Sequence, residues 1–230
     1  MKSKLGFNWN SFIAPVAKVD SERAYFRAKR ALINLVHDMT ALEGNPFTYP
    51  EVKTLIEGTT VGGRLVTDQE QVLNTAASWS LLLEKIKNKN FALSKDIFLE
   101  MNAVVAKNEA LFAGNFRDGE VGIGGTTYRP PLHSELGKLF EEGLPIIISI
   151  ENVYERAFVF FLFGSLNQFF WDGNKRTSRL MAAGELLKAG VDISSIPASR
   201  KLEFNEKMIR FYDSKDGSEM MSFLTTCIIS

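Results

Sequence analysis

The chain has 230 residues, of which 45% are hydrophobic and 23% are charged, and its 27 basic and 27 acidic side chains cancel. This composition is typical of a globular protein with an ample core, and the zero net charge gives no overall attraction to nucleic acid or to an anionic membrane. The one cysteine, Cys227, excludes an intramolecular disulfide. We therefore expect a cytoplasmic protein with neither nucleic acid nor membrane as a partner.

The first half of the chain is dominated by helical patterns. The first ten residues contain no apolar run, so a cleaved signal peptide is not expected. A helix is predicted from Ser21, as its N-cap, to the stop formed by Gly44 and Pro46. Apolar residues at helical spacing predict further helices over residues 49–58, 67–88 and 94–108.

The middle of the chain has a different composition. Residues 116–131, FRDGEVGIGGTTYRPP, contain four glycines and two prolines. Val121 and Ile123 alternate with glycine before Gly124-Gly125, which is a turn signal between short β-prone pieces. This pattern predicts a β-hairpin inserted between helices.

The second half returns to helical patterns. Helices are predicted over residues 132–143, 149–169, 174–190, 199–214 and 217–229. The longest apolar run, at 157–166, is roughly half of the ~20 apolar residues that a membrane-spanning helix needs, so it predicts a buried core helix. We predict an all-α bundle with one inserted β-hairpin, forming a single domain over residues 1–230.

One loop in this half has the features of an anion site. Gly173 and Asn174 form a turn that leads into the helix predicted from 174, where free backbone N–H groups and the positive helix end favour an anion. Arg176 and Arg179 share one face of that helix, and their guanidinium groups suit phosphate oxygens. Asp172 is a possible ligand for a divalent cation that bridges phosphates. The alternative is an ordinary turn followed by a solvated basic face.

The same residues carry a family resemblance. The stretch FFWDGNKRTSR resembles the signature of the Fic-domain family, in which His, any residue and Phe precede Asp/Glu-Gly-Asn-Gly/Lys-Arg and a further Arg three residues on. Residues 113–131 resemble the family's Gly-Xaa-(Tyr/Phe)-Arg element and its target-docking flap. Residues 40–46, TALEGNP, resemble its inhibitory-helix motif. The resemblance covers about residues 20–190, in the expected order.

The resemblance implies a mostly helical fold that transfers AMP from ATP, with Mg²⁺, to a hydroxyl of a target protein. By position, Asp172 would hold the metal, and Phe170 would be a core anchor. The nucleotide and phosphate ligands would be Gly173, Asn174, Lys175, Arg176 and Arg179. The flap that docks the target backbone would consist of Val121, Gly122, Ile123, Gly124, Gly125 and Thr126, by strand pairing.

The resemblance also assigns roles to the two ends of the chain. Residues 20–46 would form an inhibitory-helix region in which Glu43 pairs with Arg179 and occupies the space of a γ-phosphate. The alternative for Glu43 is a plain residue at a helix end. The first small residue of that motif corresponds to Met39 here, so the match is imperfect. Residues 190–230 would be a C-terminal helical extension.

The main departure from the family pattern falls on Gln168, at the position of the catalytic histidine. An amide cannot accept the proton of an attacking hydroxyl, and general-base catalysis is typically worth ~10²–10⁴-fold. The alternative base for the acceptor proton is His133, which follows the flap. Lys175 replaces the commoner Gly and also occurs in relatives linked to phosphate transfer. Asn102 stands where relatives often have another histidine, which indicates a lost structural hydrogen bond.

Several functions therefore remain open on the sequence alone. The first is an AMP transferase weakened by the loss of its base, and the second is an inactive scaffold that binds nucleotide or a protein partner. A related phosphate transferase is a further alternative. A DNA-binding regulator has little support, because the net charge is zero and no helix-turn-helix spacing is present. The sequence does not predict the oligomeric state.

Overall fold

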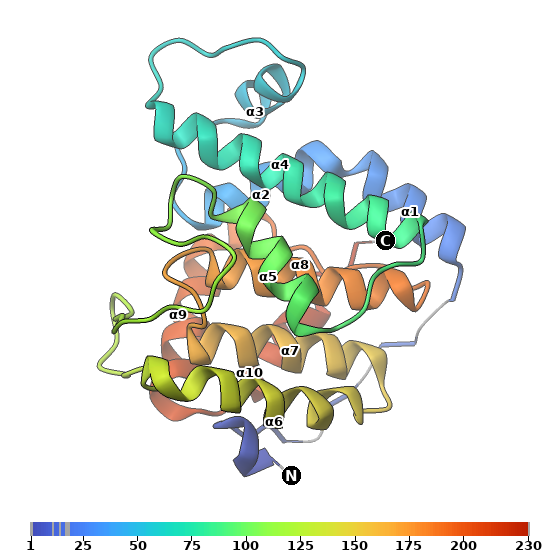
Figure 1. Cartoon of the computed structure of the whole chain (residues 1–230). Helices are drawn as coiled ribbons and strands as arrows, with labels where there is room; N and C mark the ends of the chain where they lie inside the picture. Colours follow the sequence, from blue (N-terminus) through green and yellow to red (C-terminus); the bar gives the residue numbers. More distant parts are fainter. Residues whose placement is uncertain (1, 11, 14, 17–18, 230) are drawn as a thin grey trace.

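Helices follow one another along almost the whole of the computed structural model, which describes residues 2–10, 12–13, 15–16 and 19–229. The α-helices are α1 (Ser21–Arg30), α2 (Leu32–Leu42), α3 (Tyr49–Ile56), α4 (Val66–Lys87), α5 (Lys95–Val105), α6 (Leu136–Ile148), α7 (Val153–Asn167), α8 (Asn174–Lys188), α9 (Lys201–Ser214) and α10 (Ser218–Thr225). Short 3₁₀ turns lie at Lys2–Leu5, His133–Glu135 and Ala198–Arg200. The predicted all-α class is confirmed. Figure 1 shows α4, α8, α7 and α6 lying one below another.

The centre of the core is the packing of α7 against α8. Every residue of α7 from Ala157 to Asn167 is buried, as predicted for the apolar run at 157–166. The helices approach closely because Gly164 has no side chain: a Cβ there would lie 2.0 Å from Ser178 Oγ. Phenylalanines from α5, α6, α7 and the turn after α7 form fully buried ring contacts around this pair: Phe98, Phe140, Phe160, Phe163, Phe169 and Phe170. This core fixes the turn between α7 and α8.

Some predicted helix boundaries were wrong. The helix expected over 21–46 is two helices, interrupted at Ala31, where ψ is 2°. Its N-cap is Asp20 rather than Ser21, because the Asp20 carboxylate accepts a hydrogen bond of 3.0 Å from Arg23 N. The helix expected over 132–143 runs instead from Leu136 to Ile148 and continues past Pro145.

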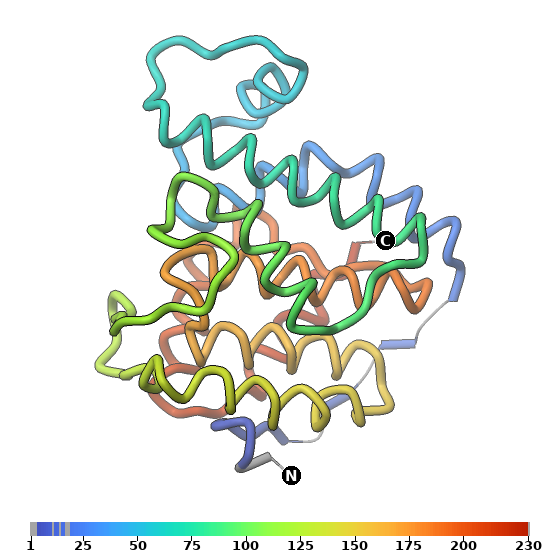
Figure 2. Tube along the Cα trace, viewed as in Figure 1, coloured from blue at the N-terminus to red at the C-terminus, as the bar shows by residue number. Residues whose placement is uncertain are grey.

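The predicted β-hairpin was also wrong, because no strand forms among residues 113–131. Gly124 and Gly125 do make a turn, with φ +83° at Gly125, but no backbone hydrogen bond joins the two arms. The prolines at 130 and 131 remove two donors that a ladder would need. Figure 2 shows this loop standing out from the helices.

Side-chain contacts hold the loop in place of a ladder. The buried Arg117 guanidinium donates to Gly119 O at 2.6 Å and to Pro131 O at 2.5 Å, so it ties both ends of the loop together. Thr126 donates to the carboxylate of Asp213, in the last turn of α9. The buried Arg117 therefore holds the two ends of the loop together, in place of the predicted strand pairing.

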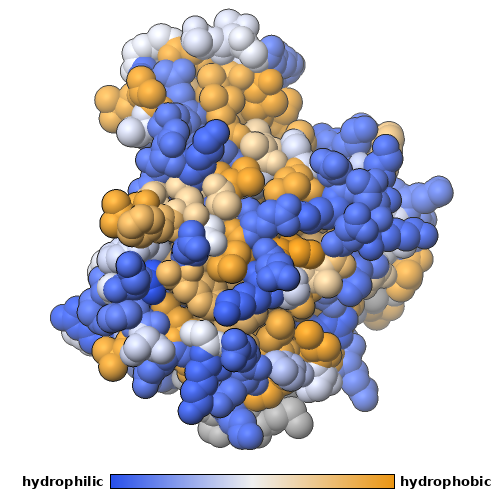
Figure 3. All heavy atoms as spheres, in the orientation of Figure 1, coloured by the Kyte–Doolittle hydropathy of each residue, from blue (hydrophilic) through white to orange (hydrophobic). Residues whose placement is uncertain are grey.

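The surface is mixed in character. In the described part of the chain, no helix is long and apolar enough to cross a membrane. Figure 3 shows hydrophobic side chains gathered over the end of the molecule formed by α3 and the start of α4. The exposed apolar residues of that region include Tyr49, Leu65 and Val66.

Candidate functional site

The turn between α7 and α8 depends on two residues with left-handed backbones. Gln168, the C-cap of α7, has φ 47° and ψ 60°, and Gly173, the N-cap of α8, has φ 75°. Gly173 has no room for a side chain, since a Cβ would lie 2.9 Å from Val105 Cγ1. Glycine is therefore required at Gly173 by both conformation and space.

Asn174 and Gln168 brace the inside of this turn. Asn174 Oδ1 accepts from Phe170 N at 2.8 Å, and its Nδ2 donates to Phe170 O at 2.8 Å and to Gln168 Oε1 at 3.2 Å. Gln168 Nε2 donates to Ser165 O at 2.7 Å, in the last turn of α7. Both ends of the Gln168 amide are therefore already hydrogen-bonded within the protein.

Asn102, on α5, holds the turn between α7 and α8 by side-chain hydrogen bonds. It is fully buried, and its Nδ2 donates to Asp172 O at 3.0 Å and to Thr177 Oγ1 at 3.2 Å. Its Oδ1 accepts from Gly114 N at 3.0 Å, at the start of the flap loop. The expectation of a lost structural hydrogen bond at Asn102 was wrong, because the amide satisfies three partners and joins the two loops.

Glu43, at the end of α2, reaches the start of α8. Its Oε1 accepts from Arg179 Nη2 at 2.8 Å, and its Oε2 lies 3.0 Å from Lys175 Nζ. The ring of Phe204 on α9 lies under both cations, with its centroid 5.6 Å from Arg179 Cζ and 6.0 Å from Lys175 Nζ. The contact between Glu43 and Arg179 is present as predicted from the sequence, and Lys175 adds a second ion pair that was not predicted.

The electrostatics keep Glu43 ionised. Burial opposes the charge of its carboxylate, but the nearby charges of Lys175, Arg179 and Arg176 outweigh burial and hold the pKa of Glu43 below its ordinary value. Only 17% of the Glu43 side chain is exposed, so water screens these pairs weakly. In this structure Glu43 therefore pairs with both cations, Lys175 and Arg179, at the start of α8.

Arg176 is paired with a different carboxylate. Its two terminal nitrogens each lie 2.9 Å from an oxygen of Glu109, and 3% of its side chain is exposed. Gln71 donates to the same carboxylate at 2.9 Å, and Asn45 donates to Gln71 Oε1 at 3.1 Å. Polar contacts thus connect Arg176 through Glu109 and Gln71 to Asn45. This network is separate from the ion pairs of Glu43.

Asp172 is the carboxylate that lies at the mouth of the turn. Its Oδ1 accepts from Arg176 Nη2 at 3.2 Å, and 53% of its side chain is exposed. Within the residues that the structure describes, no three His, Cys, Asp or Glu side chains gather as a metal site. A divalent cation at Asp172 would therefore need phosphate oxygens to complete its ligands, which is how Mg²⁺ is commonly bound with nucleotides.

Two adjoining cavities of about 440 and 230 Å³ open above the turn. Both are lined by Glu43, Gly122, Gln168 and Lys175. The larger cavity extends to α9, where it meets Asn205 and Tyr212, and burial raises the pKa of Tyr212 far above its usual range. The smaller one is lined by Asp172, Gly173, Asn174 and Arg176 as well. The structure therefore brings nearly all of the predicted nucleotide-binding residues to one place, with Arg179 just behind Glu43.

The flap residues divide between this site and α9. Gly122, Ile123 and Gly124 line the larger cavity. A Cβ at Gly125 would lie 3.1 Å from Ile209 Cδ1, and Thr126 bonds to α9. Val121 lines neither cavity.

His133 lies apart from the cavities. It does not line either of them, and its Nδ1 lies 3.2 Å from Glu120 Oε1 instead, with 43% of its side chain exposed. No histidine lines either cavity among the described residues.

Sequence reasoning missed three supporting residues. Arg117 donates to Gln168 O at 2.7 Å through its Nε and so fixes the end of α7 as well as the loop. Its place in the Gly-Xaa-(Tyr/Phe)-Arg element marked it as part of a motif without indicating its partners. Glu109 and Gln71 lie in no motif, so only the tertiary structure reveals them beside Arg176.

Comparison with known proteins agrees with this geometry. Residues 92–186 match the model of the Fic/DOC family. The match includes α5, the flap loop, α7 and most of α8.

Particular relatives match beyond that domain. The chain is 24% identical over 215 residues to the protein adenylyltransferase Fic of Drosophila erecta, and 27% identical over 183 residues to that of Aedes aegypti. These alignments cover 90% and 74% of this chain but 43% and 35% of the relatives, so the chain spans less than half of their length. A solved Fic-domain-containing signalling protein of Bacteroides thetaiotaomicron has the same fold, with a TM-score of 0.74 at 16% identity, covering 92% of this chain and 87% of that chain.

Proposed function

We propose that this protein is a Fic-type nucleotidyl transferase domain that transfers AMP from ATP to a protein hydroxyl, at a rate limited by Gln168. The observation that carries the proposal is the contact of Glu43 with Arg179 and Lys175 above an anion-binding turn. A carboxylate held between two cations marks the position where a phosphate would bind. The relatives named as protein adenylyltransferases support the choice of AMP as the transferred group.

The proposed reaction would take place in the two cavities above the turn. The phosphates of ATP would lie over the N-terminus of α8, with Asn174 and the backbone N–H groups of the turn beside them. The acceptor oxygen would attack the α-phosphorus and lose its proton to water, because the Gln168 amide cannot accept it. AMP would be joined to that oxygen, and pyrophosphate would leave. Mg²⁺, held by Asp172 and the phosphates, would offset the charge that develops on the leaving group. Glu43 would have to leave Arg179 and Lys175 before the outer phosphates could bind there.

The acceptor is proposed to be a target protein docked along the flap loop. Gly122 and Gly124 are exposed and carry no side chain, so an extended peptide could approach the backbone of this arm closely. Because the arm has no strand partner among the described residues, its N–H and C=O groups are available for pairing.

Gln168 supports a second candidate function. Its amide is bonded to Ser165 O and to Asn174, so it fills the turn without offering a base for the acceptor proton. A domain that binds nucleotide and target but transfers little or nothing would have this arrangement. The two candidates share the nucleotide site and differ only in turnover.

The first experiment is a calorimetric titration of ATP and Mg²⁺ into the wild-type chain and into Glu43→Gly. We expect the variant to bind at least about tenfold more tightly, because Arg179 and Lys175 lose a competing carboxylate. Glu57→Gly is a matched control: Glu57 also ends a helix and precedes a glycine, but it pairs only with Lys53 at 3.9 Å, and 61% of its side chain is exposed.

Each outcome has a definite meaning. Tighter binding in Glu43→Gly alone supports a nucleotide site that Glu43 blocks. Equal gains in both variants would be a general effect on folding, and absence of binding in all three proteins would refute the nucleotide site. A radiolabelled AMP-transfer assay on Glu43→Gly then separates the transferase from the scaffold.

A further inference from the structure

A further cavity lies away from the nucleotide site. This cleft of about 600 Å³ lies between the start of α1, the end of α4 and the end of α8. Helix α8 therefore meets the nucleotide site with its first turn and this cleft with its last turn. None of the residues that line the cleft lines either of the two cavities above the turn.

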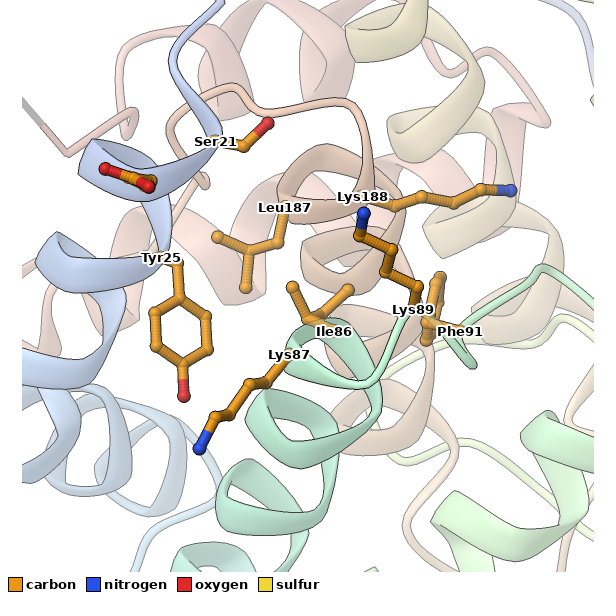
Figure 4. Close-up of a pocket in the computed structure, with 9 residues that line it drawn as sticks. Ser21, Tyr25, Ile86, Lys87, Lys89, Phe91, Leu187 and Lys188 are labelled. Atoms are coloured by element: carbon orange, nitrogen blue, oxygen red, sulfur yellow. The ribbon is translucent and has the colours of Figure 1, made fainter.

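The walls of the cleft are mainly apolar. Ile86 and the buried side chains of Phe91 and Leu187 contribute aliphatic and aromatic surface, and Tyr25 of α1 forms the opposite wall. Figure 4 shows Tyr25 and Ile86 directed into the space between the helices, with Leu187 behind them. These surfaces suit a ligand with an aromatic or aliphatic body.

The rim of the cleft is basic. Lys87, Lys89 and Lys188 line it, against one carboxylate, that of Glu22. Within the described residues none of these three lysines forms an ion pair or a side-chain hydrogen bond, whereas Lys175, Arg176 and Arg179 at the other end of α8 are all paired. Lys87 and Lys188 lie in the last turns of α4 and α8, where they also offset the negative helix ends.

Lys89 has no such role, because it lies beyond the end of α4. Its φ is 57°, a left-handed conformation that glycine or asparagine normally adopts after a helix. Lysine is a disfavoured choice there on backbone grounds alone. Its side chain lines the cleft, so its charge offers a reason for this choice.

We propose that this cleft binds a small amphipathic anion, with an apolar body against Tyr25, Ile86 and Leu187 and an acidic group at the basic rim, nearest to Lys89 (Figure 4). The volume is in the range of small-molecule sites, and the sign of the charge on the rim selects an anion over a cation. The proposal is independent of the proposed nucleotide chemistry.

The test uses 8-anilinonaphthalene-1-sulfonate, a fluorescent aromatic anion, titrated into the folded full chain. We expect one dye per chain at this cleft, with affinity reduced about two- to fivefold in Lys89→Gly and further when Lys87→Ala is added. Because glycine suits the backbone at this position, the single variant should keep or raise its melting temperature while it loses affinity.

Lys215→Gly is the matched control. Lys215 also has a left-handed backbone just beyond a helix, with φ 56° after α9, and it lies over Tyr128 rather than near the cleft. Equal dye affinity in Lys89→Gly and Lys215→Gly would overturn the proposal. Equal binding of the uncharged analogue N-phenyl-1-naphthylamine would overturn the anion selectivity.

A loss of dye affinity in Arg179→Ala but not in Lys89→Gly would place the dye in the nucleotide site and so also overturn the proposal. If Lys89→Gly fails to fold, the pair Lys87→Ala and Lys188→Ala tests the same charges without altering the loop. Unchanged affinity in that pair would count against the cleft in the same way.

Discussion

The cationic side chains at the two ends of α8 differ in whether carboxylates pair with them. At its first turns, Lys175, Arg176 and Arg179 are all held by carboxylates from other elements, Glu43 and Glu109. At its last turn, Lys188 lies with two other lysines around an apolar cleft, and none of them is paired among the described residues. A paired cation must be released before it can bind a ligand, whereas an unpaired one is ready to bind. The first end therefore suits a regulated site, and the second suits one that is always open.

The largest effect is expected from restoring a base at the regulated end. Gln168→His should raise AMP transfer by about 10²–10⁴-fold, because an imidazole can take the acceptor proton and the amide cannot. Glu43→Gly in the same chain should raise it further by freeing Arg179. The measurement is incorporation of label from α-³²P-ATP into protein.

Gln168→Ala is the control, since it removes the amide without adding a base. A rise in transfer with alanine as large as with histidine would mean that the amide merely obstructs the site. No transfer in the histidine variant, with the fold intact, would refute the assigned position of the base.

The next largest effect should come from breaking the pair of Arg176. Glu109→Ala leaves the buried Arg176 guanidinium with only the half-exposed carboxylate of Asp172 at 3.2 Å, which should lower the free energy of unfolding by about 2–4 kcal/mol. Urea unfolding measures the loss. Glu141→Ala serves for comparison, because Glu141 is 70% exposed and lies 3.7 Å from Lys95, so it should cost less than about 1 kcal/mol. Equal losses would show that Arg176 does not depend on Glu109.

A smaller effect should follow pH at Glu43. The folded-state pKa of Glu43 is lowered from its ordinary value of 4.5, so its stabilisation is complete above pH 4.5 and is lost as pH falls through the folded pKa. The wild-type chain should exceed Glu43→Gln by about 1–2 kcal/mol at pH 6 and lose that advantage in acid. Urea unfolding at a series of pH values gives this difference, and a difference that stays constant from pH 6 to pH 3 would contradict the pairing.

The smallest effect is expected at the open end. Lys188→Ala should change the free energy of unfolding by less than about 0.5 kcal/mol, because its exposed ammonium has no partner within the described residues. Thermal unfolding of the two proteins is the measurement. A loss above about 1 kcal/mol would show that the lysine is structural and would remove the contrast between the two ends of α8.

Much of this molecule could be predicted from local patterns. The apolar run at 157–166 predicted the buried α7, and the Gly173-Asn174 turn predicted where α8 begins. The Glu-Gly-Asn stretch predicted that Glu43 would reach Arg179, which the structure places at 2.8 Å. The first two predictions rest on short segments whose own residues decide the backbone conformation, whereas the contact of Glu43 with Arg179 was predicted from the family resemblance alone.

The wrong or missed predictions all concern contacts between segments that are distant in sequence. The flap failed as a hairpin because Gly124-Gly125 specifies a turn but cannot specify whether two arms pair, and Arg117 supplies distant carbonyl contacts instead. Glu109 escaped notice because its partner Arg176 lies 67 residues away in sequence. Asn102 was misjudged because its three partners come from two separate loops and from α8.

The clamp at Arg117 has a consequence for how this fold can vary. One side chain holds Gly119 and Pro131 together, so the ends of the loop stay fixed whatever lies between them. Lengthening a flexible loop twofold costs only about 0.6 kcal/mol in closure entropy. The segment around Gly124 is therefore a natural place for insertion or exchange, where a new recognition sequence could be grafted without rebuilding the helices beneath it.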